Sequence, residues 1–103
     1  MAELMPDELR ETRAAARGAR ARALLEDELL RDAFATVDAA LVQAWRDTPA
    51  RDAEGRERLH LALTLLARVH GALAQAAHDG ALSAQTLRHL RREPSAVARF
   101  LGR

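Results

Sequence analysis

Apolar residues between positions 24 and 80 recur at the spacing of two long amphipathic helices separated by a turn at residues 48–52. In the first helix, one stripe follows the i, i+3, i+4, i+7 pattern of a helix that faces a core. This stripe consists of Leu29, Leu30, Ala33, Phe34, Val37, Leu41, Ala44 and Trp45. Pro49 disfavours helical geometry at Thr48, so we expect Thr48 to cap the second helix, with Asp52 as the alternative cap. The pattern predicts a long antiparallel helical hairpin.

The second helix carries a wider apolar arc than a two-helix hairpin buries. One face is formed by Leu59, Leu63, Leu66, His70 and Leu73, and the arc continues through Leu61, Leu65, Val69, Ala72 and Ala76. At about 100° per residue, the two stripes together cover about 200° of the helix. A second copy of the chain is the simplest surface to cover the remainder. We therefore expect a homo-oligomer whose subunit interface contains Leu61, Leu65, Val69, Ala72 and Ala76.

Proline and glycine residues suggest where the first and second segments of the chain end. Pro6 suits the first turn of a helix because its missing N–H would be unpaired there, which predicts a basic helical arm over residues 1–23. Gly80 is expected to end the second long helix as a left-handed cap. Residues 24–80 then form the hairpin that serves as the oligomerisation core.

The remaining residues, 81–103, predict a short basic helix followed by a C-terminal tail. Ser83 is suited to cap a helix over residues 84–92, and Pro94 stops that helix. The tail contains three apolar residues that are candidates for docking on a partner protein, namely Val97, Phe100 and Leu101.

Composition places this chain of 103 residues in the all-α class, as a single domain. Aromatic residues make up only 3% of it, and there is no cysteine, which excludes disulfides and cysteine metal sites. No apolar run approaches the roughly 20 residues of a membrane span, and the acidic N-terminus lacks the apolar segment of a signal peptide. We therefore expect a cytoplasmic protein that does not contact a membrane.

The formal net charge of +1 conceals a segregation of charge along the chain. Residues 1–23 carry five Arg against four acidic residues, residues 24–83 six against ten, and residues 84–103 five against one. Guanidinium groups pair with phosphate oxygens, so the arginines near both ends are candidates for nucleic-acid binding. These candidates are Arg10, Arg13, Arg17 and Arg20 in the N-terminal arm, and Arg88, Arg91 and Arg92. The alternative is a solvated face whose arginines pair with nearby acids such as Asp7.

The sequence contains no pattern typical of catalysis. Its acidic cluster consists of Glu26, Asp27, Glu28 and Asp32. Consecutive helical positions point about 100° apart and do not converge on one reacting atom, so we interpret this cluster as a solvated face. There is no glycine-rich phosphate loop and no nucleophile beside a base. We therefore expect a protein that is not an enzyme and has no cofactor.

Glu57 and His60 have the Glu-x-x-His spacing found in helical di-iron proteins. They fall on the polar face of the second helix, away from the leucine face where a metal in a bundle core would lie, so we expect no metal site there. His70 lies on the apolar face and is interpreted as a hydrogen-bonded core residue. Trp45 is interpreted as a core anchor beside the turn.

Three runs of the sequence resemble the short helical proteins encoded beside packaging genes in tailed phages and in phage-derived gene transfer agents, which are similar to small terminase subunits. The runs are Leu24 to Leu30, Ala44 to Glu57 and Leu73 to Gly80. The likeness spans a little over half of the chain. Its most specific part is the turn sequence Trp45-Arg46-Asp47-Thr48-Pro49-Ala50-Arg51-Asp52.

The resemblance implies a ring of α-hairpins that positions DNA and passes it to the large terminase subunit, with the C-terminal tail docking on that subunit. Residues 1–23 are too few for the helix-turn-helix domain that small terminases usually carry. Binding of double-stranded DNA is therefore expected to be weak and non-specific, through backbone phosphates. Two other functions stay open. One is an adaptor or regulatory protein whose hairpin binds a protein partner, and the other is a small ferritin-like metal protein that depends on Glu57 and His60.

Overall fold

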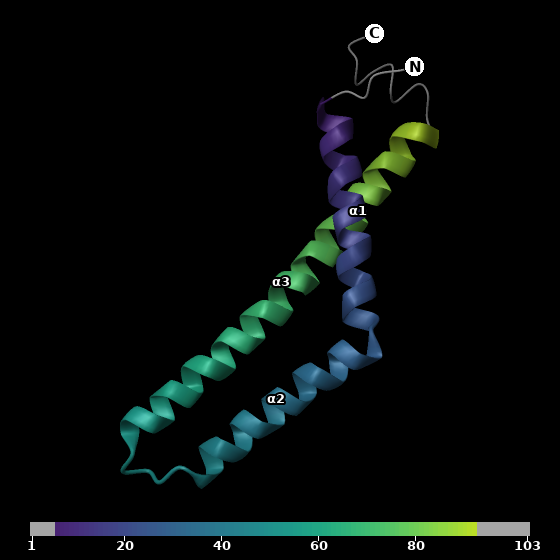
Figure 1. Cartoon of the computed structure of the whole chain (residues 1–103). Helices are drawn as coiled ribbons and strands as arrows, with labels where there is room; N and C mark the ends of the chain where they lie inside the picture. The colour runs from purple at the N-terminus through teal and green to yellow at the C-terminus, as the bar shows by residue number, and fades with distance from the viewer. Residues whose placement is uncertain (1–5, 93–103) are drawn as a thin grey trace. The chain divides into compact units, whose positions relative to one another are not determined.

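The computed structural model describes residues 6–92, which form three helices joined by two short connections (Figure 1). Helix α1 spans Pro6–Glu26, α2 spans Glu28–Asp47 and α3 spans Ala53–Arg92. No strand occurs within this part of the chain, so the prediction of an all-α fold is confirmed. Across the same residues, no helix combines the length and apolar character needed to cross a membrane.

The helices contribute to two compact units. Unit 1 contains Met1–Arg22 and Gln75–Arg103, and unit 2 contains Ala23–Ala74. Helices α1 and α3 each contribute residues to both units, whereas α2 lies wholly in unit 2. The described residues of unit 1 carry eight Arg against four acidic residues, a net charge of +4, while unit 2 carries six Arg against nine acidic residues, a net charge of −3.

Unit 1 is built where α1 crosses the C-terminal part of α3, at Gly18 and Gly80 (Figure 1). A Cβ added to Gly18 would lie 2.8 Å from the carbonyl oxygen of Ala76, and one added to Gly80 would lie 2.9 Å from that of Ala14. The missing side chains therefore let the two backbones pack directly against each other. All buried residues in the described chain belong to this crossing, namely Gly18, Ala21, Gly80, Ser83 and Leu87.

Unit 2 places α2 beside the first half of α3, with residues 48–52 joining them (Figure 1). Two contacts set their register. The guanidinium of Arg56 lies over the ring of Trp45 near the connection, and farther along the pair the ring of His70 meets that of Phe34 edge-on, with the centroids 5.6 Å apart. Unlike unit 1, unit 2 contains no buried residue.

The structure corrects the predicted end of the second long helix at Gly80. Helix α3 continues without a break to Arg92, so Gly80 is not a left-handed cap and residues 84–92 are not a separate helix. Ser83 is a buried residue inside α3 and not a cap. The physical reason is the crossing itself, because Gly80 serves the close approach of α1, and burial there offsets the unfavourable helix propensity of glycine.

The helix ends in unit 2 also differ from two of the predictions. The helical conformation is interrupted at Asp27, between α1 and α2. The Oδ1 of Asp27 accepts a hydrogen bond of 2.8 Å from the backbone N–H of Leu30 and thereby caps α2. Asp27 is thus a capping residue and not simply part of a solvated acidic face. Thr48 ends α2 and does not cap the next helix. The alternative, Asp52, provides the cap by accepting a 3.0 Å hydrogen bond from the N–H of Gly55.

Candidate nucleic-acid interface

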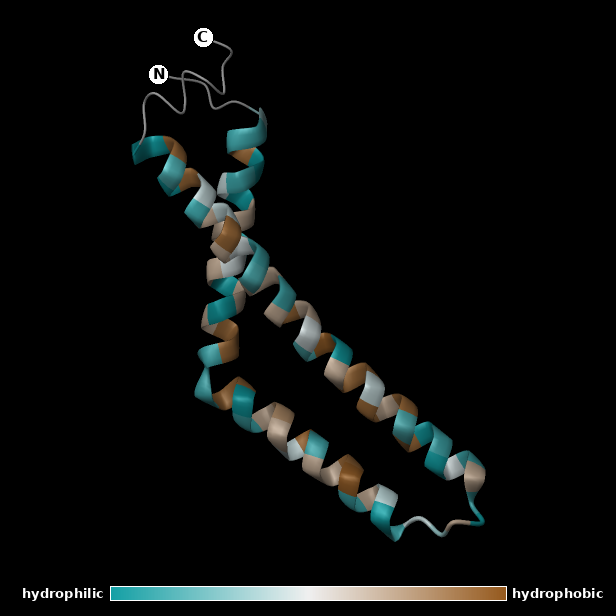
Figure 2. Cartoon of the chain, turned by 180° about the vertical axis from the view of Figure 1, so that it is seen from behind, coloured by the Kyte–Doolittle hydropathy of each residue, from teal (hydrophilic) through white to brown (hydrophobic). Residues whose placement is uncertain are grey.

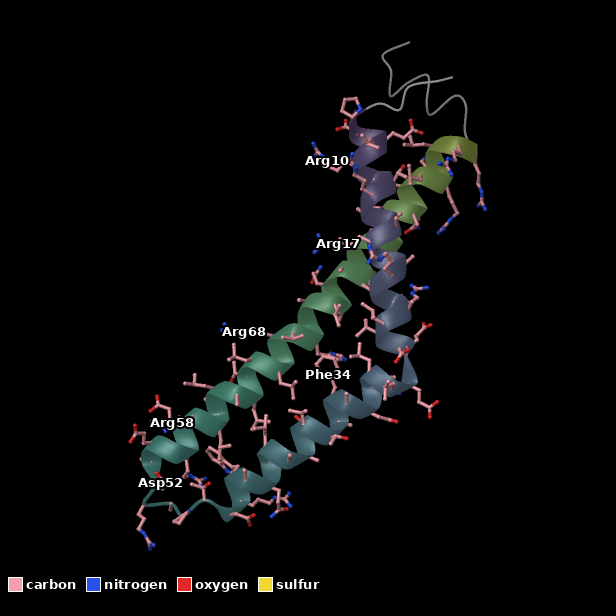
Figure 3. All side chains as sticks on the ribbon, viewed as in Figure 1. Arg10, Arg17, Phe34, Asp52, Arg58 and Arg68 are labelled. Carbon is pink, nitrogen blue, oxygen red and sulfur yellow. The ribbon has the colours of Figure 1, made fainter. Side chains whose placement is uncertain are left out.

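The predicted arginines of α1 form a solvent-facing stripe, which we call the α1 stripe, consisting of Arg10, Arg13, Arg17 and Arg20. All four are exposed, and Figure 3 shows Arg10 and Arg17 extending to the same side of α1. At about 100° per residue, the four positions occupy an arc of about 80° centred about 120° away from Gly18. The helix therefore uses its small residues to pack on α3 and leaves the α1 stripe free for another molecule.

Acidic neighbours do not neutralise these arginines. Within residues 6–92, the only ion pair joins Arg58 to Glu54 in unit 2, at 3.0 Å. The interpretation that the α1 stripe pairs with acids such as Asp7 therefore finds no ion pair to support it in the described chain. The excess of positive charge in unit 1 consequently remains available to an anionic partner.

A second basic feature lies in a shallow groove of about 250 Å³ on one side of the helix crossing, which we call the crossing groove. Its lining consists of Ala15, Gly18, Ala19, Arg22, Ala77, Gly80, Ala81, Ala84 and Arg88. The two arginines come from different helices and are the only charged residues among these. Sequence reasoning missed Arg22 because it falls outside the 3, 4, 3 spacing of the α1 stripe, and only the helix crossing brings it to the same groove as Arg88.

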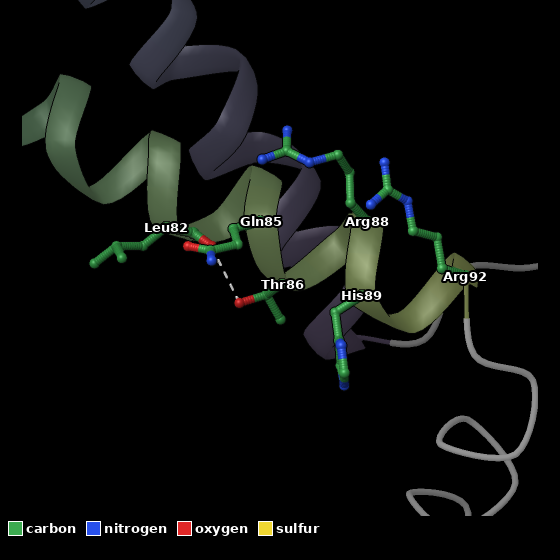
Figure 4. A pocket seen from close by; sticks show the side chains of 6 residues that line it. All are labelled: Leu82, Gln85, Thr86, Arg88, His89 and Arg92. Carbon is green, nitrogen blue, oxygen red and sulfur yellow. Dashed lines mark hydrogen bonds between the residues drawn. The ribbon is translucent and has the colours of Figure 1, made fainter.

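The arginines predicted near the C-terminus extend this basic surface along α3. Arg88, Arg91 and Arg92 are all exposed. Figure 4 shows Arg88 and Arg92 in a second hollow, whose lining also includes Leu82, Gln85, Thr86 and His89. The hydroxyl of Thr86 donates a 3.1 Å hydrogen bond to the carbonyl oxygen of Leu82 and so is occupied within the helix. Arg88 and Arg92 provide the positive charge of this lining and are therefore its candidates for binding an anion.

The seven predicted arginines do not form one continuous patch. On α1, the α1 stripe is centred about 120° to one side of Gly18, whereas Arg22 of the crossing groove lies about 40° to the other side. The α1 stripe and the crossing groove, which also contains Arg88, therefore lie on opposite sides of the crossing. Unit 1 therefore presents cationic side chains on both sides. This distribution suits a long polyanion better than a small ligand that needs several groups converging on it.

The predicted interface residues divide between the two units. Leu61, Leu65 and Val69 are 54%, 60% and 55% exposed, and Ala72 is exposed as well. Ala76 instead belongs to unit 1, where it is partly buried beside Gly18. The candidate docking residues Val97, Phe100 and Leu101 lie outside the described residues.

The possible metal ligands do not form a site in the part of the chain that the structure describes. No group of three or more His, Asp or Glu side chains there is placed to hold a metal ion, and both Glu57 and His60 are exposed. His70 is also exposed, so its assignment to a core is wrong. Its ring packs edge-on against Phe34 beside a small apolar hollow of about 170 Å³, whose lining includes Leu24, Leu25, Leu30 and Arg31.

Trp45 has a structural role at the end of α2 that involves a residue the sequence did not single out. The guanidinium of Arg56 lies 3.8 Å from the centroid of the Trp45 ring. Its Nη1 also donates hydrogen bonds to the carbonyl oxygens of Trp45, at 3.4 Å, and Thr48, at 3.1 Å. Arg56 therefore binds the carbonyl oxygen of Thr48 and shares that of Trp45 with the backbone N–H of Thr48, while its plane covers the indole. We therefore exclude it from the candidate interface.

Comparison with known proteins does not assign a function to this chain. No family model matches the chain, and neither a curated protein nor a solved structure shows significant similarity to it.

Proposed function

We propose that this chain is a small terminase-like component of DNA packaging in a phage or a gene transfer agent. In this role it self-associates, binds double-stranded DNA weakly through backbone phosphates and presents that DNA to a large terminase subunit. One observation carries the proposal. The described part of unit 1 holds eight arginines against four acidic residues, and no ion pair neutralises any of these arginines.

Unpaired surface arginines favour binding to nucleic acid for a physical reason. Each guanidinium that contacts a phosphate releases a condensed counterion, so several contacts together yield useful affinity without any reading of bases. Phosphate contacts of this kind position a protein on DNA but carry no sequence information directly. The proposed binding is consequently strong at low salt, weak at physiological salt and similar for unrelated sequences.

Fluorescence anisotropy with two labelled 30-base-pair duplexes of unrelated sequence tests the proposal. We expect similar affinities for both duplexes and a steep loss of affinity between 50 and 200 mM salt. Replacing two residues of the α1 stripe, Arg13→Ala with Arg17→Ala, should weaken binding to both duplexes. It should also lower the slope of log K against log salt by about 1.8, because each neutralised phosphate contributes about 0.9 to that slope.

The matched control removes the same charge from unit 2. Arg46 and Arg51 are exposed and have no ion pair in the described structure, so Arg46→Ala with Arg51→Ala changes the net charge equally. We expect this control to bind DNA nearly as the unaltered chain does. Absence of binding at 50 mM salt, or an equal decrease of affinity in both double variants, would overturn the proposal.

A protein adaptor is the second candidate function, and the exposed leucine and valine side chains of unit 2 favour it. Apolar surface of this kind on a helical pair is typical of contacts with another protein. The adaptor predicts retention of a specific partner by the immobilised chain and no binding to duplex DNA at any salt concentration. The anisotropy experiment therefore separates the two functions.

A further inference from the structure

Both helices of unit 2 expose a flank of apolar side chains to solvent, and we call the two flanks together the apolar face. It consists of Leu29, Ala33, Val37 and Ala40 from α2, and Leu61, Leu65, Val69 and Ala72 from α3. Leu29 is the most exposed large member at 79%, and Val37 is 47% exposed. Only the α3 flank was predicted to form an interface. Leu29, Ala33 and Val37 were predicted to face the core, and that prediction is wrong because all three are exposed. The apolar positions of both helices appear in brown in Figure 2.

The two flanks lie on the same side of unit 2. In α2 the flank is rotated about 85° from the stripe of Leu30, Phe34 and Leu41 that faces α3. In α3 the flank is rotated about 125° from the inward stripe of that helix. When each helix is viewed along its axis from the N-terminus to the C-terminus, the flank is rotated from the inward stripe in the same sense in both helices. Because α2 and α3 run in opposite directions, an equal sense of rotation brings both flanks to one side.

The opposite side of unit 2 is more polar. It carries Glu28, Arg31, Asp38 and Arg46 from α2, and Glu57, His60 and Thr64 from α3, among the small residues Ala35, Ala39 and Ala67. A pair of helices that is apolar on one side and polar on the other lacks only one covering layer.

The apolar face, on the order of 600 Å², is comparable with the roughly 800 Å² that each partner contributes to a standard interface. A second copy with the same face therefore fits the requirement.

Charge at the edges of the apolar face selects one arrangement of the two copies. Asp32 lies toward the outer edge of α2, and Figure 3 shows Arg68 on the side of α3 away from α2. The contacts of Trp45 with Arg56 and of Phe34 with His70 place Asp32 within about one turn of the level of Arg68.

We propose that two copies of unit 2 pair through the apolar face to form a four-helix bundle with a two-fold axis along the helices. This axis sets α2 beside the partner's α3, which brings Asp32 to the level of Arg68 of the partner subunit. An axis across the helices would instead set α2 against α2 and keep Asp32 away from the partner's Arg68. The inference replaces the ring that the resemblance implies with a dimer, and it does not depend on DNA binding.

Sedimentation velocity of the full chain at micromolar concentration tests the proposal. We expect a dimer for the unaltered chain and a monomer for Leu65→Glu. Leu82, which is 51% exposed on unit 1, provides the control, because Leu82→Glu makes the same substitution outside the apolar face and should leave the dimer intact. A monomeric unaltered chain, an assembly larger than a dimer, or a dimer that survives Leu65→Glu would overturn the proposal.

A charge exchange tests the axis with substitutions that leave the apolar face untouched. In the dimer, residue 32 of each copy meets residue 68 of the other copy, so each contact occurs twice. Asp32→Arg alone or Arg68→Asp alone therefore creates two pairs of like charges, and we expect about a tenfold rise in the dissociation constant of the dimer. The two changes combined should restore it to within about threefold. Equal weakening in the combined variant would exclude the axis along the helices. Anisotropy on the same samples keeps the proposals separate, since a monomer that still binds duplex DNA refutes only the dimer.

Discussion

Gly18 of α1 and Gly80 of α3 lie backbone against backbone at the centre of unit 1, each occupying the space that a side chain on the other would need. The carbonyl oxygens of Ala76 and Ala14 close the remaining space at 2.8 Å and 2.9 Å from the two Cβ positions. Rigid backbone atoms surround both glycines, so an added methyl group meets groups that do not rotate away. The helix crossing thus depends on the absence of two side chains.

We expect Gly18→Ala and Gly80→Ala each to lower the free energy of unfolding by about 1–3 kcal/mol, the usual cost of overpacking. Gly71 offers a matched control in the same helix as Gly80, because a Cβ there meets nothing within 4 Å. Gly71→Ala should raise the free energy of unfolding by about 0.5–1 kcal/mol, since alanine is the better helix former. Urea denaturation followed by circular dichroism measures all three. Stabilisation by all three substitutions would contradict the crossing.

Arg56 should stabilise the connection between α2 and α3 more than its neighbour Arg58. Lysine keeps the charge of Arg56 but lacks the planar group that stacks on Trp45 and the guanidinium geometry that reaches two carbonyl oxygens. We expect Arg56→Lys to cost about 1–2 kcal/mol and to change the fluorescence of the single tryptophan. In contrast, Arg58→Lys should change stability little, because the ion pair of Arg58 with Glu54 is exposed. Equal effects of the two variants would argue against the stack.

Asp27→Ala should destabilise the start of α2, because the backbone N–H of Leu30 loses its side-chain acceptor. The loss of a helix N-cap typically costs about 1 kcal/mol. Asp38 is an exposed acid in the middle of the same helix, so Asp38→Ala removes an equal charge without removing a cap. Urea midpoints compare the two variants. A larger shift for Asp38→Ala would refute the capping role.

Arg22 and Arg88 should contribute to DNA affinity as the α1 stripe does, although only Arg88 was predicted from the sequence. Arg22→Ala with Arg88→Ala removes both charges of the crossing groove. We expect weaker binding and a salt slope lower by about 1.8, as for two residues of the α1 stripe. Anisotropy at several salt concentrations measures the slope. An unchanged salt slope would indicate that DNA contacts only the side of the crossing that carries the α1 stripe.

Local sequence patterns were sufficient for the helical class and for much of unit 2. The stripe that includes Phe34, Leu41 and Trp45 repeats at helical spacing, and this spacing depends only on the order of residues along one helix. Asp52 was identified as a possible cap for the same reason, since a capping side chain bonds to the backbone three residues later. The exposure of Leu61, Leu65 and Val69 also follows from one helix having more apolar surface than one neighbour covers.

The amino-acid sequence by itself therefore determined that this protein is helical, where its apolar stripes run and that its arginines gather toward the two ends. Only the tertiary structure decided what Gly80 does. A glycine that ends a helix and a glycine that admits another backbone are identical in sequence, and the partner, Gly18, lies 62 positions away. The joining of Arg22 with Arg88, and of the α2 and α3 flanks into one apolar face, likewise depends on how separate helices are placed. Spacing along the chain contains no information about that placement.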